Sequence, residues 1–186
     1  MADRITTKPI TVEDVEGWEA KHPAREIIRG EWAEDAKVAG QKHNLIGKRL
    51  FRLLDRFVME HELGEVYTDG LNYVLDGTPG NITTMRIPDL SFVTSEKVDT
   101  DESGYLYFAP DLAVEVLSPS ETAKIITDKI ADYRKFGTKQ VWVIDSSTQS
   151  ITVHHADGRT NTYGKDQTLS GGDLLPEFEI AISELF

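Results

Sequence analysis

The sequence contains no cysteine, which excludes disulfide-stapled scaffolds, thiolate metal sites, iron–sulfur clusters and cysteine nucleophiles. It also has no apolar run near the ~20 residues that cross a bilayer. The first 23 residues have no apolar core of the signal-peptide type. We therefore expect a cytoplasmic protein without a membrane partner.

Basic residues are scarce relative to acidic ones. The chain has 20 lysines and arginines against 32 aspartates and glutamates, a formal net charge of −12. Such a charge argues against a protein that coats nucleic acid through bulk attraction to phosphates. It does not exclude a nuclease, because a cluster of acids in a catalytic site is neutralised by bound metal ions.

Internal repeats and linker-like tracts are also missing, and 186 residues are enough for one well-buried domain but short for two. We expect an N-terminal extension over residues 1–23, with a short helix at 12–20 that begins after Thr11, and one domain over residues 24–186. The residue pattern predicts, in order, a helix, a hairpin, a long helix, strands, a helix and strands. This order indicates an α/β domain with a mixed sheet.

The long helix is predicted over residues 41–62, where apolar residues recur at steps of three and four. Its other face is basic, with Asp55 as the one acid in the stretch 42–56. Two interpretations of this face stay open: a solvated helix surface, or a patch that binds the phosphates of a nucleic acid. The basic residues are Lys42, Lys48, Arg49, Arg52 and Arg56.

Two acids stand in segments that otherwise read as buried strands, Asp89 in the stretch 86–93 and Glu115 in the stretch 111–117. Burial of an ionised carboxylate costs several kcal/mol unless a cation or hydrogen bonds compensate it. A metal ion or a lysine would provide that cation. Because side chains alternate along a strand, Asp111 lies on the same face as Glu115. It either joins the same pocket or faces water at the start of the strand.

A lysine is available on the helix that is predicted to follow this strand. That helix runs from Ser120, the expected N-cap, to about Phe136, and Gly137 is typical of the residue that ends a helix. Lys129 lies within this helix. It either pairs with the buried acids or is an ordinary exposed helix residue.

Several segments resemble the Uma-type restriction-endonuclease-like family, which belongs to the PD-(D/E)XK nuclease superfamily. The resemblance covers roughly residues 22–186, and its most specific part is the Glu-Val-Leu-Ser-Pro-Ser stretch followed by the lysine helix. The segments that carry it are Glu26–Glu31, Ile87–Val93, Pro110–Ser120, Asp128–Lys129, Tyr133–Gly137, Val141–Asp145 and the Leu-Pro-Glu-Phe-Glu-Ile tail.

The resemblance implies a restriction-endonuclease-like αβββαβ core with a mixed central sheet and flanking helices, an extra N-terminal helix and hairpin, and C-terminal strands. It implies that Asp89 and Glu115 are metal-binding carboxylates. The family commonly carries a lysine two residues after the glutamate, where this chain has Leu117. The resemblance therefore implies that Lys129 supplies the catalytic ammonium group. Glu31 is the first choice for a further catalytic acid because it follows a glycine turn, and Glu26 is the second.

His43, at the start of the long helix, also belongs to the resemblance, and it either lies near the pocket or packs at the helix start. The activity implied by the resemblance is that of a metal-dependent endonuclease, which hydrolyses DNA phosphodiester bonds as a homodimer. Hard oxygen ligands would select Mg²⁺ or Mn²⁺ as the cofactor. Two alternatives remain: a nuclease-fold binding or interaction protein that has lost catalysis, and a hydrolase of a small phosphorylated substrate.

Overall fold

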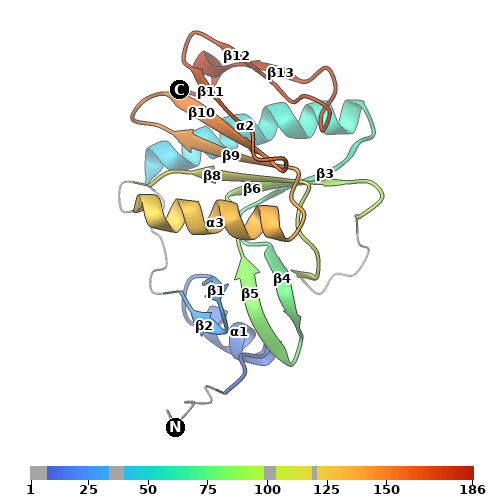
Figure 1. The fold of residues 1–186 in the computed structure, drawn as a ribbon, viewed down its shortest axis with the longest axis vertical. Coiled ribbons are helices and arrows are strands. Elements are labelled where there is room, and N and C mark those ends of the chain that lie inside the picture. Colours follow the sequence, from blue (N-terminus) through green and yellow to red (C-terminus); the bar gives the residue numbers. More distant parts are fainter. Residues whose placement is uncertain (1–7, 34–39, 99–103, 119–120) are drawn as a thin grey trace.

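The computed structural model describes residues 8–33, 40–98, 104–118 and 121–186 of the chain. It confirms a mixed α/β fold, with a central sheet of six strands between two long helices (Figure 1). The strands of this sheet lie in the order β11-β10-β9-β8-β6-β3. Their bounds are β3 Gly64–Thr68, β6 Leu90–Thr94, β8 Leu112–Val116, β9 Gln140–Asp145, β10 Ser150–His155 and β11 Thr160–Gly164.

β8 and β9 form the parallel pair at the centre of the sheet, whereas β6 and β10 run antiparallel to them. All residues of β8 are buried, which is typical of a strand covered on both faces. Its side chains alternate, so Val114 and Val116 join the apolar core on one face, while Ala113 and Glu115 are directed to the other. An ionisable side chain is thereby placed in the layer between the sheet and a helix.

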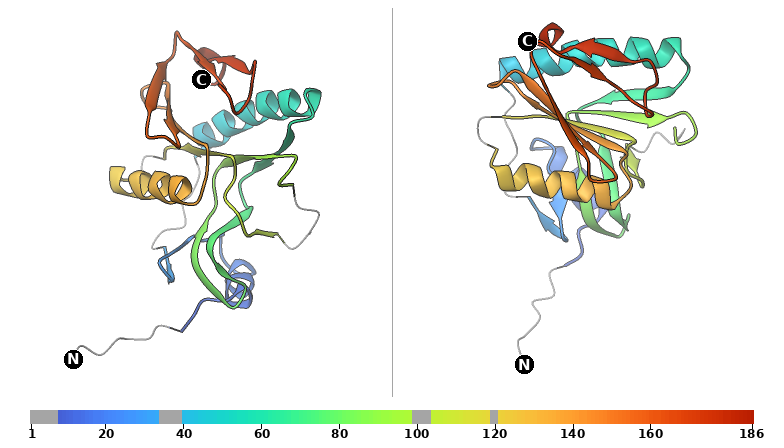
Figure 2. Two further views of the ribbon diagram at one scale, coloured as in Figure 1. Left: turned by 45° about the vertical axis from the view of Figure 1, so that its right-hand side comes forward. Right: turned by 45° about the horizontal axis from the view of Figure 1, so that its top comes forward.

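α2 (Gln41–Glu60) and α3 (Ala123–Lys135) cover opposite faces of the central sheet (Figures 1 and 2). The period of the apolar residues explains how α2 packs, since one stripe of its surface is buried and the rest is polar. The buried stripe of α2 is Ile46, Leu50, Leu54 and Val58. α3 differs, because the two residues that it buries, Lys129 and Tyr133, are both polar at their ends.

α3 begins later than the sequence predicts. Its N-cap is Thr122, whose side-chain oxygen accepts a hydrogen bond from the backbone N–H of Ile125 at 3.3 Å. Ser120, the expected cap, lies outside the described residues. The end of the helix is as expected, since Gly137 follows it with φ of +103°, a left-handed conformation that favours glycine.

A second sheet of five strands lies below the first in Figure 1, in the order β2-β1-β5-β4-β7. The single strand expected over residues 86–93 is therefore two strands in different sheets, because β5 ends at Arg86 and β6 begins at Leu90. Pro88 lies between them and has no N–H to donate to a ladder, which explains the break. The bounds are β1 Ile27–Ile28, β2 Glu31–Trp32, β4 Asn72–Thr78, β5 Asn81–Arg86 and β7 Tyr105–Leu106.

α1 (Val12–Glu19) packs against this second sheet. Thr11 caps the helix as expected, through a capping box with reciprocal side-chain and backbone hydrogen bonds. Ile10 and Val15 are buried together with Ile27 and other apolar residues of the sheet. The N-terminal segment from residue 8 onward therefore shares an apolar core with strands of the second sheet.

The C-terminal residues form a small cover over α2. β12 (Thr168–Ser170) pairs with β13 (Glu179–Ala181), and a short 3₁₀ helix, Ile182–Glu184, follows at the top of Figure 1. Apolar side chains of this region join the same core as the buried stripe of α2. Within the described ranges, no helix combines the length and the apolar character that crossing a membrane requires.

Candidate active site

Asp89 lies in the gap between β5 and β6, directly before the first residue of β6. In the antiparallel register of β6 and β8, Leu90 stands opposite Val114, and the same register places Asp89 opposite Glu115. The Oδ2 atom of Asp89 accepts a hydrogen bond from the backbone N–H of Val116 at 2.7 Å. The neighbouring strand therefore holds this carboxylate beside the second acid.

His43 provides another contact of Asp89, from the first turn of α2. Its Nε2 atom lies 3.2 Å from Oδ2 of Asp89. Burial alone would raise the pKa of Asp89, but His43, the Val116 N–H and the charge of Lys129 outweigh it, so the pKa lies below its usual value. Asp89 is therefore ionised at neutral pH.

Glu115 is almost completely buried, with 1% of its surface exposed, and its side chain extends from β8 to α3. The hydroxyl of Tyr133 donates a hydrogen bond to Oε1 at 2.9 Å, and the ammonium group of Lys129 donates one to Oε2 at 2.5 Å. Lys129 and Tyr133 are four residues apart, so one face of α3 presents both. The structure therefore agrees with the interpretation in which Lys129 pairs with a buried acid, and not with that of an exposed helix residue.

Lys129 keeps its positive charge in this environment. Burial alone would lower its pKa, but the charges of Glu115 and Glu26 raise it above its usual value, and Asp89 contributes in the same direction. Its Nζ atom lies 3.4 Å from Oε1 of Glu26. Lys129 is therefore a hydrogen-bond donor and a fixed cation at neutral pH, and it is not available as a neutral base.

Glu26, at the entrance to β1, is the additional acid that reaches this cluster. Besides Lys129, it contacts Arg86, whose Nη1 lies 2.8 Å from Oε2, and the backbone N–H of Ile87, which lies 3.2 Å from Oε1. Glu31, the first choice for this additional acid, was the wrong one of the two, because it is exposed on β2. β2 is an edge strand of the second sheet, one strand farther from this cluster than β1.

The two glutamates of the hairpin differ in their expected contribution to stability. We expect Glu26→Gln to lower the free energy of unfolding by about 1–3 kcal/mol, because the change removes a charge that Arg86 and Lys129 share. The matched change Glu31→Gln is expected to alter it by less than about 0.5 kcal/mol, since that side chain is exposed. Urea denaturation followed by circular dichroism measures both, and equal effects would contradict the assignment.

Carboxylates outnumber cations in this cluster. Among the described residues, the cluster contains four acids and two permanently charged bases, and His43 contacts one of these acids, Asp89. A divalent cation would compensate such an excess of carboxylates. The acids are Glu26, Asp89, Glu115 and Asp132, and the cations are Arg86 and Lys129.

The donor set suits a hard divalent ion. Among the described residues, no three histidine, aspartate or glutamate side chains gather as a ready-made metal site. Mg²⁺ does not require one, since it usually binds one or two carboxylates and completes its shell with waters and substrate phosphates. Asp89 and Glu115 supply two such carboxylates at a place that is short of positive charge. These residues therefore fit Mg²⁺ or Mn²⁺.

Comparison with known proteins identifies the family and the fold. Residues 12–183 match the family Uma2, which is described as "Putative restriction endonuclease". The chain belongs to the Uma2 family. A solved structure with the same fold is that of a putative nuclease belonging to DUF820 from Anabaena variabilis ATCC 29413. It has a TM-score of 0.81 and 22% identity, and the alignment covers 96% of this chain and 98% of that chain. No curated protein matches the sequence.

Asp111 does not belong to the cluster of this Uma2 chain. It faces the same side of β8 as Glu115, as the alternation predicts, but it lies at the other end of the strand. Lys97 and Lys139 lie 3.0 and 3.1 Å from its Oδ1 atom, and the backbone N–H of Thr94 donates to Oδ2 at 3.0 Å. The carboxylate is completely buried, so both expectations for Asp111 are corrected: it neither joins the pocket nor faces water.

The basic residues of α2 have different surroundings in the Uma2 structure. Lys48 lines a cavity of about 190 Å³ together with Asp89. Lys42 and Arg49 donate hydrogen bonds to backbone carbonyls, one in the β9–β10 turn and two at the C-terminus. Arg52 and Arg56, farther along the helix, are exposed. Of the five, Lys48 is therefore the one that the structure places at the candidate site.

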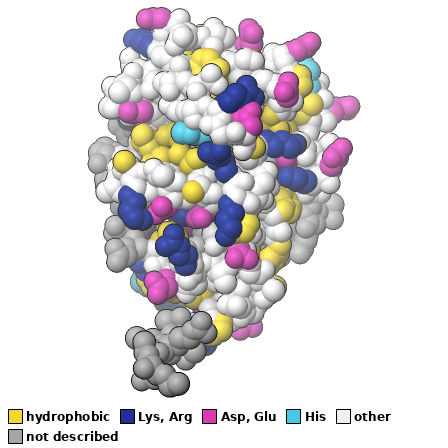
Figure 3. All heavy atoms as spheres, viewed as in Figure 1, with side chains coloured by type: hydrophobic (Ala, Val, Ile, Leu, Met, Phe, Trp, Pro, Cys, Tyr) yellow, Lys and Arg dark blue, Asp and Glu magenta, His cyan; other side chains and the backbone are white. Residues whose placement is uncertain are grey.

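The surface charge of the Uma2 chain is mixed on the side that carries α3. In the view of Figure 3, lysines and arginines alternate with aspartates and glutamates and form no continuous basic surface. This distribution agrees with the net charge of −12. Any attraction to phosphates on this face is therefore local rather than spread over the surface.

Sequence reasoning missed three residues of the cluster: Arg86, Asp132 and Tyr133. Arg86 is 1% exposed, and its guanidinium group bridges Glu26 and Asp132. Helical spacing carried a signal for the other two, since Asp132 and Tyr133 follow Lys129 by three and four residues and so share its face. For Arg86 the available signal was a charged residue at the end of a strand that is otherwise apolar or neutral.

Proposed function

We propose that this chain is a metal-dependent nuclease that hydrolyses phosphodiester bonds in DNA. The observation that carries the proposal is the position of Lys129, 2.5 Å from Glu115 and within the field of Asp89 on the neighbouring strand segment. Phosphodiester hydrolysis needs positive charge at such a point, because negative charge develops on the phosphate oxygens and the leaving oxygen. Membership of a family described as "Putative restriction endonuclease" supports the same class of reaction.

Mg²⁺ or Mn²⁺ is the proposed cofactor, held by Asp89 and Glu115. Such an ion, when bound, lowers the pKa of a coordinated water and neutralises charge on the phosphate. The excess of carboxylates over cations in the cluster supports this proposal. The two carboxylates offer hard oxygen donors, and these suit Mg²⁺ and Mn²⁺.

Lys129 would orient the attacking water or donate a hydrogen bond to a phosphate oxygen. Its raised pKa keeps the proton on Nζ, so it stabilises charge and does not abstract a proton. Burial, together with the charges of Glu115 and Glu26, raises the pKa of Tyr133 well above its usual value. The Tyr133 hydroxyl therefore remains a donor that holds the Glu115 carboxylate in place.

DNA is the proposed substrate because the cavity beside Asp89 opens along the first turns of α2, where Lys48 can meet a phosphate of a long chain. His43 contacts Asp89 and would fix its orientation. A homodimer is part of the proposal, since two copies of the site can act on the two strands of a duplex.

The test is the nicking of supercoiled plasmid DNA by purified protein. We expect nicking with Mg²⁺ or Mn²⁺ and none with EDTA, and we expect Asp89→Asn to reduce the rate by about 10²-fold. Asp76→Asn is the matched control, because Asp76 is an exposed residue of β4. The proposal fails if the wild type never nicks DNA, or if the Asp89→Asn preparation nicks at the wild-type rate, which would reveal a contaminating nuclease.

A further inference from the structure

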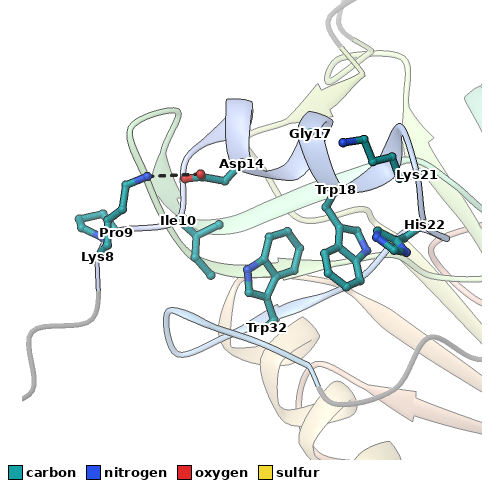
Figure 4. Close-up of a pocket in the computed structure, with 9 residues that line it drawn as sticks. All are labelled: Lys8, Pro9, Ile10, Asp14, Gly17, Trp18, Lys21, His22 and Trp32. Carbon is teal, nitrogen blue, oxygen red and sulfur yellow. Dashed lines mark hydrogen bonds and ion pairs between the residues drawn. The ribbon is translucent and has the colours of Figure 1, made fainter.

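A second cavity lies away from the acid–lysine cluster, between α1 and the β1–β2 hairpin (Figure 4). Its volume is about 440 Å³, which is within the range of small-molecule sites, roughly 300–1,000 Å³. Two indole rings, one from the helix and one from the hairpin, form part of its wall. The lining residues are Lys8, Pro9, Ile10, Asp14, Gly17, Trp18, Lys21, His22 and Trp32.

The aromatic wall is built from three rings. The centroids of Trp18 and Trp32 lie 5.6 Å apart with an interplanar angle of 32°, and His22 stacks on Trp18 at 4.2 Å. Trp18 is anchored, since its Nε1 donates a hydrogen bond to the carbonyl of Pro23 at 3.1 Å. Both tryptophans are only half-buried. Flat and partly exposed indole rings that are held in place can stack with another flat ring.

Basic groups surround these rings. Lys8 and Lys21 line the cavity, and the guanidinium group of Arg25 lies 5.1 Å from the ring of Trp18. One acid, Asp14, also lines it and pairs with Lys8 at 3.4 Å. The other acids in the first turns of α1, Glu13 and Glu16, line a different cavity of about 650 Å³. The basic groups at the aromatic wall come from residues that flank α1, while two acids of α1 line a different cavity, in a chain that is strongly acidic overall.

The same hairpin connects this cavity with the candidate active site. Trp32 stands opposite Ile27 in the β1–β2 pair, and the residue before Ile27 is Glu26, which contacts Lys129. Arg25, next in the chain, contacts Trp18. The cavity and the candidate site are therefore built on adjacent residues of one hairpin, which allows a single substrate strand to contact both.

We propose that the Trp18–Trp32 cavity is a subsite for an unpaired nucleobase of the substrate strand, with Lys21 and Lys8 near its phosphate. The proposal rests on the proposed nuclease function and specifies its substrate as a strand with single-stranded character beside the cleaved bond. Aromatic stacking together with basic side chains is the combination that binds single strands without reading their sequence. The acidic remainder of the surface opposes binding of duplex DNA at this point by charge alone.

The test uses the intrinsic fluorescence of the full chain, titrated with a short oligothymidylate in EDTA so that no cleavage occurs. The chain has three tryptophans, and Trp142 is buried in the central core, where it serves as an internal reference. We expect quenching on binding, and we expect Trp32→Leu and Trp18→Leu each to weaken binding by about tenfold. Lys21→Gln should reduce the slope of log affinity against log salt by about 0.7. The matched control is Lys165→Gln, which should leave the slope unchanged, because Lys165 is an exposed lysine between β11 and β12 that does not line the cavity.

The possible results distinguish the subsite proposal from the nuclease proposal. Wild-type protein that binds oligothymidylate without quenching, or tryptophan variants that bind it as tightly as the wild type, would overturn the subsite. Equal affinity for a duplex of the same length would overturn it as well. The wild-type titration needs no variant, so the test does not depend on how well Trp32→Leu folds. The wild type could show quenching that the tryptophan variants lose, while no plasmid is nicked. In that case the subsite proposal stands and the nuclease proposal fails.

Discussion

Replacing Lys129 by methionine is expected to lower the free energy of unfolding by about 3–5 kcal/mol. Lys129 is 2% exposed and pairs with two carboxylates, Glu115 at 2.5 Å and Glu26 at 3.4 Å. Methionine fills a similar volume but removes the ammonium group that pairs with the buried Glu115 carboxylate. Removal of one partner of a buried ion pair is costly because the remaining charge stays desolvated. Urea denaturation followed by circular dichroism measures the loss.

Two further variants show whether the loss comes from the buried charge. Lys124→Met removes a lysine from the same helix, but that lysine is 80% exposed in its pair with Asp128, so we expect a change below about 1 kcal/mol. The double variant Lys129→Met with Glu115→Gln removes both members of the pair and should recover part of the stability. A Lys129→Met protein as stable as the wild type would show that Glu115 is not ionised beside it.

Glu115→Gln is expected to reduce plasmid nicking by about 10³-fold while the protein stays folded. Glutamine keeps an oxygen that can accept the Tyr133 hydrogen bond, and Lys129 keeps its partner Glu26. The variant therefore loses a charge that would hold the metal ion, with little change in packing. The rate of plasmid nicking with Mg²⁺ measures the first effect, and a thermal melt measures the second.

The control for this variant is Glu65→Gln, an exposed glutamate on β3, which should nick at the wild-type rate. Isothermal titration with Mn²⁺ gives an independent readout, since Glu115→Gln should bind the ion more weakly even where nicking is slow. Unchanged nicking by folded Glu115→Gln would remove Glu115 from the mechanism. Lost nicking with unchanged Mn²⁺ binding would leave it a role other than that of metal ligand.

The loss of stability expected for Lys129→Met and the loss of nicking expected for Glu115→Gln have the same structural cause. The cluster holds more acids than bases in a region that is largely shielded from water, which destabilises the fold without a bound cation. Arg86 and Lys129 limit that cost, because each contacts carboxylates from different elements and so connects the second sheet with α3. The same excess of negative charge is what would attract a divalent metal ion.

Local sequence pattern was sufficient for the two long helices and for singling out the central acids. The period of the apolar residues predicted α2 and α3 within a few residues. Glu115 stood out because an ionised carboxylate in an apolar strand needs a counter-charge, and Lys129 on the next helix was one candidate for it. A β-strand followed by a helix that packs back on it brings those two positions together, so this pair could be inferred from neighbouring segments alone.

Local sequence pattern could not predict which residues from distant segments contact one another. Whether Glu26 or Glu31 meets Lys129 depends on which strand of the hairpin lies beside β5, and whether Asp111 meets Lys139 depends on the register of β8 and β9. Arg86 became a bridge only because Pro88 separates β5 from β6 and sends them into different sheets. Periodicity specifies which face of an element is apolar, but the partner of a buried charge depends on how distant elements pack, and that information is not local.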